Sequence, residues 1–364
     1  MIIQNMTPND LYELLNNLSG EKNIYIYGAG VAGRNYGLFL NQRNIKWIGY
    51  VDSDSKKQGK ILNDKTIYSL KNLNHKETVL FLIAVGIHNI QDVKKVLENE
   101  GYEYIYIDNT AFLSEIAIEI KQPKQQFARL KKFYKCHQGE RCFIVGNGAS
   151  LRISDIEKIN DCSFVTNTFY KMYQYMAWRP MYYILHDPTM EAFIHEDNSM
   201  GTIANSVSAV FMNFLYTFFD SKIDEIYNNV YYYRAAAYDE KNGTEVISED
   251  ISKIMFGMGT SVSYMYQLAF YMGFEEIYLI GMDFSFSRSR LKDGTIILNN
   301  NEKDSPDCMK SPKLQGTYCV DKILEGHIVA KKYADQHDIK IYNATRGGKL
   351  DVFPRVNFDT LFTQ

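Results

Sequence analysis

Two segments, each an apolar run that enters a glycine-rich turn, constrain the fold of this chain more than any other feature. The first is IYIYGAGVAG (24–33) and the second is FIVGNGASL (143–151). A buried strand that leads through glycines into a helix is the opening of a nucleotide-binding α/β unit. Because two such openings lie more than a hundred residues apart, we expect two units of this kind.

The periodicity along the chain supports this division. Strand and helix signals alternate up to residue 112, residues 113–138 have the composition of a charged linker helix, and a second alternating series fills 139–364. Such alternation predicts parallel sheets covered by helices on both faces. At 364 residues the chain is long enough to bury two cores. We therefore predict an α/β protein of two Rossmann-like domains with mainly parallel sheets, at 1–112 and 139–364.

Charge and cysteine content exclude several classes of protein. The net charge of −3 gives no electrostatic footprint for nucleic acid. The basic stretch 121–135 leaves peripheral membrane association open, although a solvated linker face is the favoured explanation. The five cysteines form no CxxC pair and no metal-ligand spacing, which is typical of reduced thiols. Since no signal peptide or bilayer-spanning run is evident either, we expect a soluble cytoplasmic protein without a metal site.

The first glycine loop matches GxGxxG through Gly28, Gly30 and Gly33, and Asp52 ends the next predicted strand. In a dinucleotide enzyme these residues would hold a pyrophosphate and a ribose hydroxyl. However, YGAGxxG followed by IGYVDSDSKKQGK and IYSL resembles the N-terminal domains of bacterial polysaccharide-biosynthesis proteins, including sugar acyltransferases of the PglD type. That resemblance implies a nucleotide-sugar ligand, and a purely structural turn remains open, so we treat this loop as accessory.

The second glycine loop is followed by polar residues at the ends of the next predicted strands. In an open parallel sheet these ends lie at one edge, where ligands bind. His186 ends one such strand and is a candidate base, and a helix N-terminus at 259–261 offers an anion site. The candidate substrate- and nucleotide-binding residues are Gly146, Asn147, Gly148, Ser150, Asn167, Asp187, Gly259, Thr260, Ser261, Asp283 and Ser285.

Four motifs, in order, carry a second resemblance. GNGASL, the TNTFY strand, GTSVSYMYQLAFYMGFEEIYLIGMDF and IKIYNATRGGKL together resemble the MptE-like family, also known as domain of unknown function 115. That family is related to the α-2,3-sialyltransferases of glycosyltransferase family 42 and to the Maf flagellin glycosyltransferases. Over about residues 140–355 the resemblance implies a GT-A-like fold of the sialyltransferase type. It also implies transfer of a CMP-linked sugar to a glycan or glycoprotein acceptor in surface-glycan biosynthesis.

The resemblance also implies roles for individual residues. Asn147 and Ser150 would surround the phosphate and sugar of the donor, and Asn167 would contact the nucleotide. Asp187 would face the cytosine or ribose, and the Thr260–Ser261 turn would hold the donor carboxylate.

The chain departs from the sialyltransferase pattern at three places. Met258 and Gly259 stand where an arginine precedes the turn, and Ser285 replaces a phosphate-binding tyrosine, so that Arg288 or Arg290 would have to substitute. The position of the catalytic histidine falls on Lys322, with His327 about one helical turn further on. The candidates for the general base are therefore His186, Lys322 and His327.

Two alternatives to a glycosyltransferase remain. An ATP-dependent pyrophosphokinase of the hydroxymethylpterin type would need Mg²⁺ and a pair of carboxylates, for which Asp187 and Asp283 qualify. A nucleotide-sugar-binding protein without catalysis fits the missing arginine and histidine. Arg346 either reaches a phosphate or solvates a turn. Glycosyl transfer itself needs no obligatory cofactor, and the sequence leaves a homo-oligomer open.

Overall fold

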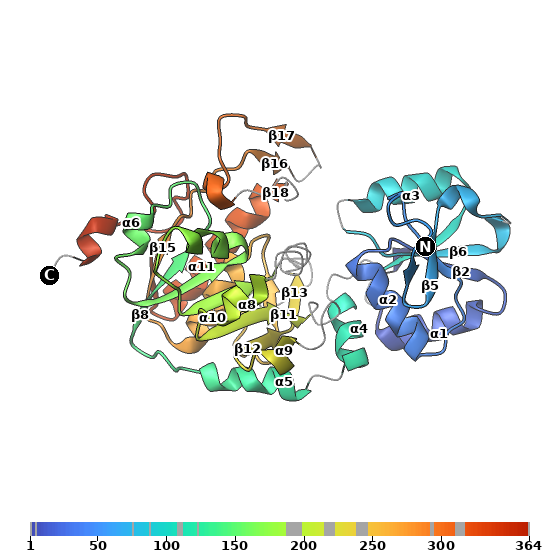
Figure 1. The fold of residues 1–364 in the computed structure, drawn as a ribbon, viewed down its shortest axis with the longest axis horizontal. Coiled ribbons are helices and arrows are strands. Elements are labelled where there is room, and N and C mark those ends of the chain that lie inside the picture. Colours follow the sequence, from blue (N-terminus) through green and yellow to red (C-terminus); the bar gives the residue numbers. More distant parts are fainter. Residues whose placement is uncertain are drawn as a thin grey trace. The chain divides into compact units, whose positions relative to one another are not determined.

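The chain folds into two compact units, Met1–Pro123 and Lys124–Gln364, each drawn in Figure 1. The computed structural model describes all residues except positions 1, 4–5, 75, 87–88, 108–111, 122–123, 187–198, 215–222, 238–246, 292–294, 310–316 and 363–364. The prediction of two α/β domains with mainly parallel sheets is confirmed, because each unit has a seven-stranded sheet whose neighbouring strands run parallel with one exception. The finer assignment to the sialyltransferase type stays a prediction.

The first unit has the strand order β1-β7-β6-β2-β3-β5-β4, in which only β4 and β5 pair antiparallel. Its strands are β1 (Ile2–Ile3), β2 (Asn23–Tyr27), β3 (Gly49–Val51), β4 (Ile61–Leu62), β5 (Lys65–Tyr68), β6 (Val79–Ile83) and β7 (Glu103–Ile107). Its helices are α1 (Pro8–Leu18), α2 (Val31–Gln42), α3 (Ile90–Asn99) and α4 (Phe112–Lys121), with 3₁₀ turns at Leu70–Asn72 and Lys76–Thr78.

The second unit has the strand order β12-β11-β10-β9-β8-β15-β19, parallel throughout. Its strands are β8 (Arg141–Val145), β9 (Cys162–Thr166), β10 (Tyr182–Leu185), β11 (Ala209–Asn213), β12 (Val230–Tyr233), β15 (Glu276–Ile280) and β19 (Lys340–Asn343). Its helices are α5 (Lys124–Ala128), α6 (Ile153–Ile156), α8 (Ser199–Ala204), α9 (Ile223–Ile226), α10 (Val262–Met272) and α11 (Val320–Gln336). Its 3₁₀ turns are Arg129–Phe133, Asn167–Gln174, Asp307–Met309 and Phe358–Phe362.

Two small sheets accompany the main sheet of the second unit. β13 (Ala235–Ala237) pairs with β14 (Met255–Gly257), which leads into the N-terminus of α10. β16 (Arg288–Arg290) pairs with both β17 (Ile296–Leu298) and β18 (Tyr318–Cys319). The second of these sheets is formed within the polar segment that follows β15.

The segment predicted as a linker, 113–138, is divided between the units. α4 belongs to the first unit, where Phe112 and Ile116 are buried and the Phe112 ring stacks on Tyr36 with centroids 6.0 Å apart. The residues after α5 belong to the second unit, where Leu130 and Phe133 are part of the core. Because both halves carry buried apolar side chains, each half is anchored in its own unit.

Helix α10 is the centre of the second core. Every one of its residues, from Val262 to Met272, is buried, and the helix ends at Gly273 in the left-handed conformation with φ of 87°. Its one amide side chain, Gln267, is fully hydrogen-bonded: it accepts from the backbone N–H groups of Ser248 and Phe256 and donates to the carbonyls of Phe256 and Ser263. Burial of a polar group is tolerated only with such partners.

The strand order reverses between β8 and β15 in the second unit, and between β2 and β6 in the first. In open α/β sheets, ligands bind beyond the carboxyl ends of the strands at such reversals. Both predicted glycine loops follow a strand at a reversal, β2 and β8 respectively. Within the part of the chain that the structure describes, no helix is long and apolar enough to cross a membrane.

Candidate functional site

The glycines of the second loop allow two turns to pack against each other. The N–H of Gly146 donates to the carbonyl of Ile280 over 2.8 Å, and that of Gly148 donates to Gly281 over 2.9 Å. A Cβ added to Gly148 would lie 2.5 Å from the Gly281 carbonyl oxygen and 2.6 Å from the Asp283 carboxyl carbon. These glycines are therefore required where the loop after β8 meets the loop after β15, whether or not a ligand binds.

Asp283 closes the second glycine loop. Its Oδ2 accepts the backbone N–H of Ser150 over 2.7 Å, and its Oδ1 accepts the Ser150 hydroxyl. The carboxylate is nearly buried, and the Asp283 carbonyl accepts from Lys349 over 2.7 Å. Both carboxylate oxygens of Asp283 therefore accept hydrogen bonds that hold the turn. In this arrangement Asp283 orients the loop, and neither oxygen is free to bind a metal ion.

Asn147 and Asn167 come together beyond the ends of β8 and β9. The Asn147 amide donates to the carbonyl of Thr166 over 3.1 Å, and the Asn167 amide donates to the Ser261 hydroxyl over 3.0 Å. The Oδ1 atoms of both asparagines are buried and have no hydrogen-bond partner among the described residues. An unpaired buried acceptor costs about 1–3 kcal/mol, so each of these two atoms marks a position that a donor group would satisfy.

The backbone at Asn167 is held in an uncommon conformation. Its φ of 51° lies in the left-handed region, where asparagine is among the better tolerated residues. The hydroxyl of Tyr183 donates to the Asn167 carbonyl over 2.5 Å and accepts from the N–H of Tyr170 over 3.0 Å. The sequence did not single out Tyr183, because this residue belongs to an apolar strand whose other side chains are typical of a hydrophobic core.

The turn Gly259–Ser261 precedes α10 and completes this edge. Gly259 has φ of 73°, the Thr260 hydroxyl accepts from the N–H of Val262 over 3.3 Å, and Ser261 occupies the N-cap position. Ser261 thereby receives the Asn167 amide at the N-terminus of an eleven-residue helix. The structure thus brings together Asn147, Asn167 and the 259–261 turn, which lie far apart in the sequence.

The two candidate histidines are held in aromatic surroundings. The Nδ1 atom of His186 lies 3.0 Å from the Tyr233 hydroxyl, and its ring stacks on Tyr264 with centroids 3.9 Å apart. The Nδ1 atom of His327 lies 2.9 Å from the hydroxyl of Tyr266 in the core. Desolvation lowers the pKa of His186 to about 3 and that of His327 to about 4. Both rings are neutral at pH 7 and are weak bases in this state.

The remaining predicted residues lie around this edge. Lys322 is exposed, and its Cβ would lie 3.1 Å from a Cβ added to Gly259. The Ser285 hydroxyl donates to Glu302, which also receives the ammonium of Lys349. Lys349, more than Ser285, lowers the pKa of the Glu302 carboxyl. Asp187 lies outside the described residues.

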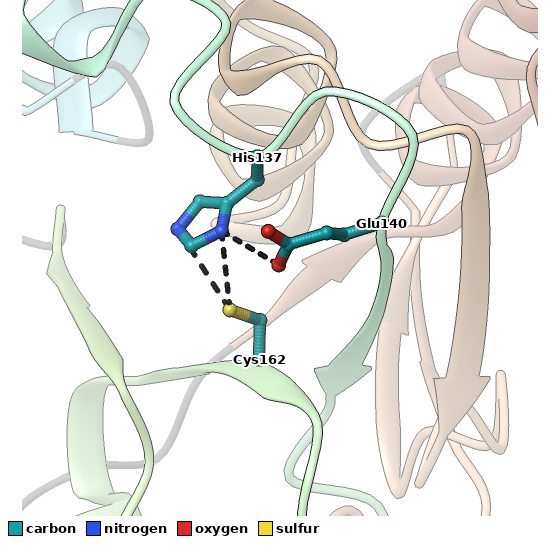
Figure 2. A group of neighbouring side chains, drawn as sticks. All are labelled: His137, Glu140 and Cys162. Atoms are coloured by element: carbon teal, nitrogen blue, oxygen red, sulfur yellow. Dashed lines mark hydrogen bonds and ion pairs between the residues drawn. The ribbon is translucent and has the colours of Figure 1, made fainter.

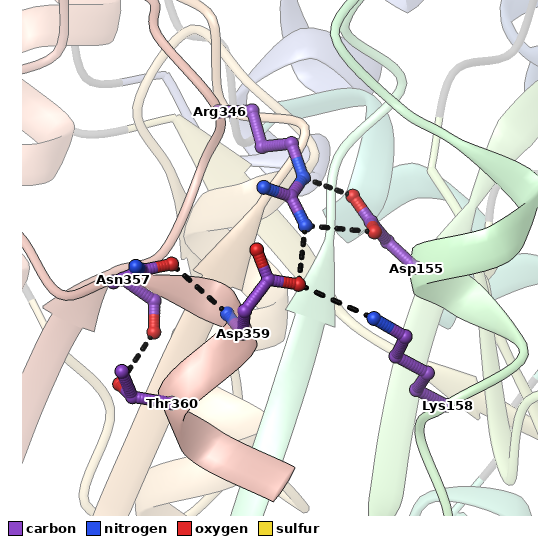
Figure 3. Close-up of polar contacts among 6 residues, drawn as sticks. All are labelled: Asp155, Lys158, Arg346, Asn357, Asp359 and Thr360. Carbon is purple, nitrogen blue, oxygen red and sulfur yellow. Dashed lines mark hydrogen bonds and ion pairs between the residues drawn. The ribbon is translucent and has the colours of Figure 1, made fainter. Parts of the chain in front are cut away.

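Arg346 forms a bridge between α6 and the C-terminal turn, as Figure 3 shows. Its Nη2 atom donates to Asp155 Oδ1 over 3.0 Å and to Asp359 Oδ1 over 2.7 Å, and Lys158 donates to the same Asp359 oxygen over 3.2 Å. These carboxylates raise the pKa of Arg346 further, and Arg346 in turn lowers that of Asp359 to about 2. Arg152 lines a hollow next to Arg346 and was not singled out by the sequence.

The first glycine loop is closed in the same manner as the second. Asp52 Oδ2 accepts from the N–H of Ala29 over 2.8 Å and from the ammonium of Lys57 over 3.0 Å, and its Oδ1 accepts from Asp54 over 2.9 Å. Burial opposes ionisation of Asp52, but the hydrogen bonds outweigh it and lower the pKa of the carboxyl. A Cβ on Gly28 would lie 2.5 Å from the Ala84 carbonyl. Gly33 allows α2 to pack against Gly28, whereas Gly30 is the N-cap of α2 with open space around it.

Comparison with known proteins finds a family match for part of each unit. Residues 111–289 match the MptE-like family, described as 6-hydroxymethylpterin diphosphokinase MptE-like, and residues 20–107 match the family described as C2185-like, N-terminal. The first match confirms the relationship predicted from the four motifs. The likeness of the first unit to PglD-type domains stays a prediction.

Comparison with whole proteins adds little. No curated protein matched the sequence. Among solved structures the chain is similar to the MAf glycosyltransferase from Magnetospirillum magneticum AMB-1, at 14% identity and a TM-score of 0.38, over 93% of this chain and 58% of that one. The chain therefore spans a little over half the length of that protein, and a likeness this low carries no argument about activity.

Proposed function

We propose that the second unit, which matches the MptE-like family, is a glycosyltransferase that binds a nucleotide-activated sugar at the carboxyl edge of its sheet. The donor is CMP-linked by the resemblance to sialyltransferases, and the acceptor is a glycan or glycoprotein in surface-glycan biosynthesis. The observation that carries the proposal is the pair of buried Oδ1 atoms of Asn147 and Asn167, which lack partners among the described residues.

The chemistry of these two atoms selects the part of the ligand that they would contact. An amide oxygen accepts hydrogen bonds, so it attracts the hydroxyls of a sugar or the amino group of cytosine and repels a phosphate. The phosphate would instead be bound at the N-terminus of α10 by the Gly259–Ser261 turn, where the helix dipole and the hydroxyls of Thr260 and Ser261 favour an anion. Asn147 would therefore contact the sugar or base of the donor.

The three candidate bases differ in their suitability. His327 is buried in the core and His186 is stacked on Tyr264, and both have depressed pKa values. Lys322 is exposed beside the Gly259 turn, where an ammonium group would neutralise the leaving phosphate. We propose Lys322 as a charge partner of the leaving group and His186 as the histidine at the ligand edge.

The proposal is tested by ligand binding followed by turnover. The thermal midpoint of the full chain is measured with CMP, CDP, UDP, GDP, ATP and NAD, and again for the Asn147→Ala and Asn167→Gly variants. We expect one pyrimidine nucleotide to raise the midpoint of the wild type and to raise it less in either variant. Stabilisation by NAD alone, or an equal shift in all three proteins, would contradict the proposed site. Binding without sugar transfer to any acceptor would point to a non-catalytic nucleotide-sugar-binding protein.

A second candidate function is supported by the description of the matched family, which names a hydroxymethylpterin diphosphokinase. That reaction would consume ATP and release AMP, and it would use Mg²⁺ held by carboxylates. Asp283 is already bound through both oxygens to Ser150, so it would have to give up these bonds to ligate a metal. Incubation with ATP, Mg²⁺ and a hydroxymethylpterin distinguishes the candidates, since AMP release supports the kinase.

A further inference from the structure

A histidine, a glutamate and a cysteine converge at the amino ends of β8, β9 and β10, which is the edge opposite the candidate ligand site. His137 and Glu140 lie in the loop before β8, and Cys162 is the first residue of β9. Figure 2 shows the three side chains pointing toward one another. One ligand atom from each, a ring nitrogen, a carboxylate oxygen and a thiol sulfur, lies within 4.8 Å of the other two.

The distance between the histidine nitrogen and the thiol sulfur matches that between two ligands of a tetrahedral metal ion, although the directions of the side chains have to adjust. The Nδ1 atom of His137 is 3.6 Å from the Cys162 sulfur and 2.9 Å from Glu140 Oε2. A tetrahedral Zn²⁺ with bonds of about 2.3 Å to sulfur and about 2.05 Å to nitrogen separates those two ligands by about 3.6 Å. The nitrogen and the carboxylate oxygen would have to separate to about 3.4 Å. The Glu140 side chain can make this small movement because it is 56% exposed.

The surroundings of His137 select the tautomer that a ligand needs. The Nε2 atom of His137 lies 2.6 Å from the Tyr182 hydroxyl, and the ring stacks on Phe274 with centroids 4.6 Å apart. With Nε2–H donating to this hydroxyl, Nδ1 keeps its lone pair. The Cys162 sulfur lies 3.6 Å from Nδ1 and 3.7 Å from Nε2, so the ring has to rotate to direct that lone pair at an ion bound to the thiol. The backbone of the loop is fixed as well, because the N–H groups of His137 and Gly139 donate to the carbonyls of Met272 and Gly273.

We propose that His137 Nδ1, a Glu140 carboxylate oxygen and Cys162 Sγ form a binding site for Zn²⁺, with the fourth position open to solvent. Nitrogen, oxygen and thiolate ligands together suit Zn²⁺, and an alkaline-earth ion would require oxygen ligands. Binding forms a zinc–thiolate bond and releases the thiol proton to solvent, with no change of oxidation state. The ion would tie the 137–140 loop to the start of β9 without contact with the candidate ligand site.

The sequence gives no signal for such a site, and the spacing of the cysteines led us to expect a protein without a metal site. The histidine and glutamate are three residues apart in a loop, but the thiol comes from a strand 22 residues later. The structural role that these residues have without an ion is an ion pair between His137 and Glu140 beside a buried thiol. That role accounts for the contact between His137 and Glu140, but it does not require a thiol sulfur within 3.6 Å of Nδ1.

The test uses the untagged full-length chain, stripped of metal with EDTA and titrated with Zn²⁺ against a chromogenic chelator. We expect one tightly bound Zn²⁺ per chain, and a thiolate-to-metal absorption band when Co²⁺ replaces it. Glu140→Gln, at an exposed position, should weaken binding by at least about tenfold without affecting folding. Tyr182→Phe, which removes the partner of Nε2, should weaken it by about 10–100-fold.

Matched cysteine variants give the control. Cys142 on β8 pairs in register with Cys162 on β9 but is not one of the clustered ligands. Cys162→Ala should abolish the Co²⁺–thiolate band, whereas Cys142→Ala should retain it and the full affinity. The proposal is overturned if the wild type binds no stoichiometric Zn²⁺, or if Glu140→Gln and Cys162→Ala bind as the wild type does. Neither result depends on nucleotide binding at the other edge.

Discussion

Replacement of Asn147 by alanine should separate ligand binding from stability. The change removes the hydrogen bond from Nδ2 to the Thr166 carbonyl, which contributes about 1 kcal/mol net. It also removes a buried Oδ1 that has no partner among the described residues, and that atom costs the folded protein about 1–3 kcal/mol. Because the two effects oppose each other, the free energy of unfolding of Asn147→Ala should lie within about 1 kcal/mol of the wild type or above it. Its nucleotide affinity should fall by about tenfold, as expected for one lost hydrogen bond.

Asn343 provides a matched control for this prediction. It is buried in the same unit, but its side chain is satisfied: Nδ2 donates to Leu350 over 2.8 Å and Oδ1 accepts from Thr345 over 3.0 Å. Asn343→Ala leaves the Thr345 N–H unpaired and the Leu350 carbonyl with only the long hydrogen bond from Arg355, and should destabilise the unit by about 2 kcal/mol or more.

The assay is urea unfolding followed by fluorescence. A Trp47→Phe background leaves Trp178, in the second unit, as the reporter of that unit. If Asn147→Ala lost as much stability as Asn343→Ala, the Asn147 oxygen would have a partner and the reasoning would fail.

Three further predictions follow from the same contacts. Ser150→Ala removes the hydroxyl that donates to the nearly buried Asp283 carboxylate, and it should lower the free energy of unfolding in urea by about 1.5–3 kcal/mol. The control is Ser206→Ala, which removes a hydroxyl that donates to a carbonyl and should lower that free energy by about 1 kcal/mol or less. Gly148→Ala places a Cβ 2.5 Å from the Gly281 carbonyl and should lower the free energy of unfolding by about 1–3 kcal/mol. Gly347→Asn, at a left-handed turn with open space around it, should lower it less. Equal losses in the two variants would contradict the close approach of the two loops. His327 has its pKa lowered to about 4 from an unfolded value of about 6.5, so only the unfolded state binds its proton between these values. The contribution of the neutral ring to the free energy of unfolding is complete above pH 6.5 and should fall by roughly 3 kcal/mol as the pH drops to 4. The difference in stability between the wild type and His327→Gln should therefore narrow over that range. A difference that stays constant with pH in denaturant titrations would refute this prediction.

Much of the fold could be predicted because it depends on local patterns. Apolar runs that alternate with amphipathic segments specify parallel strands and covering helices, and the turn at Gly273 ends α10 as its sequence indicates. The linker could not be placed, because its charged residues hide a few apolar anchors on each side, such as Phe112 and Phe133, that belong to different cores.

The candidate site could be predicted only in part. Parallel strands bring their carboxyl ends together, and at that edge Asn147 contacts the end of β9 while Asn167 contacts Ser261 in the 259–261 turn. The environment of His327 could not be read from sequence, since a histidine one helical turn from a candidate position can face either solvent or core. Its neighbours Gly326 and Ala330 are buried on the same face of α11, so the ring lies in the core.

The two glycine loops show why glycine spacing alone does not identify a ligand. In each unit a carboxylate from a neighbouring strand end, Asp52 or Asp283, accepts a backbone N–H of the loop. An anion bound there would have to compete with a carboxylate that already occupies one of these donors, so a loop closed in this way is a poor phosphate cradle. The second loop differs because it adds Asn147, whose buried Oδ1 has no hydrogen-bond partner among the described residues. The feature that distinguishes the two loops is therefore an unsatisfied acceptor, and under the proposed function it would contact a hydroxyl or amino group of the ligand.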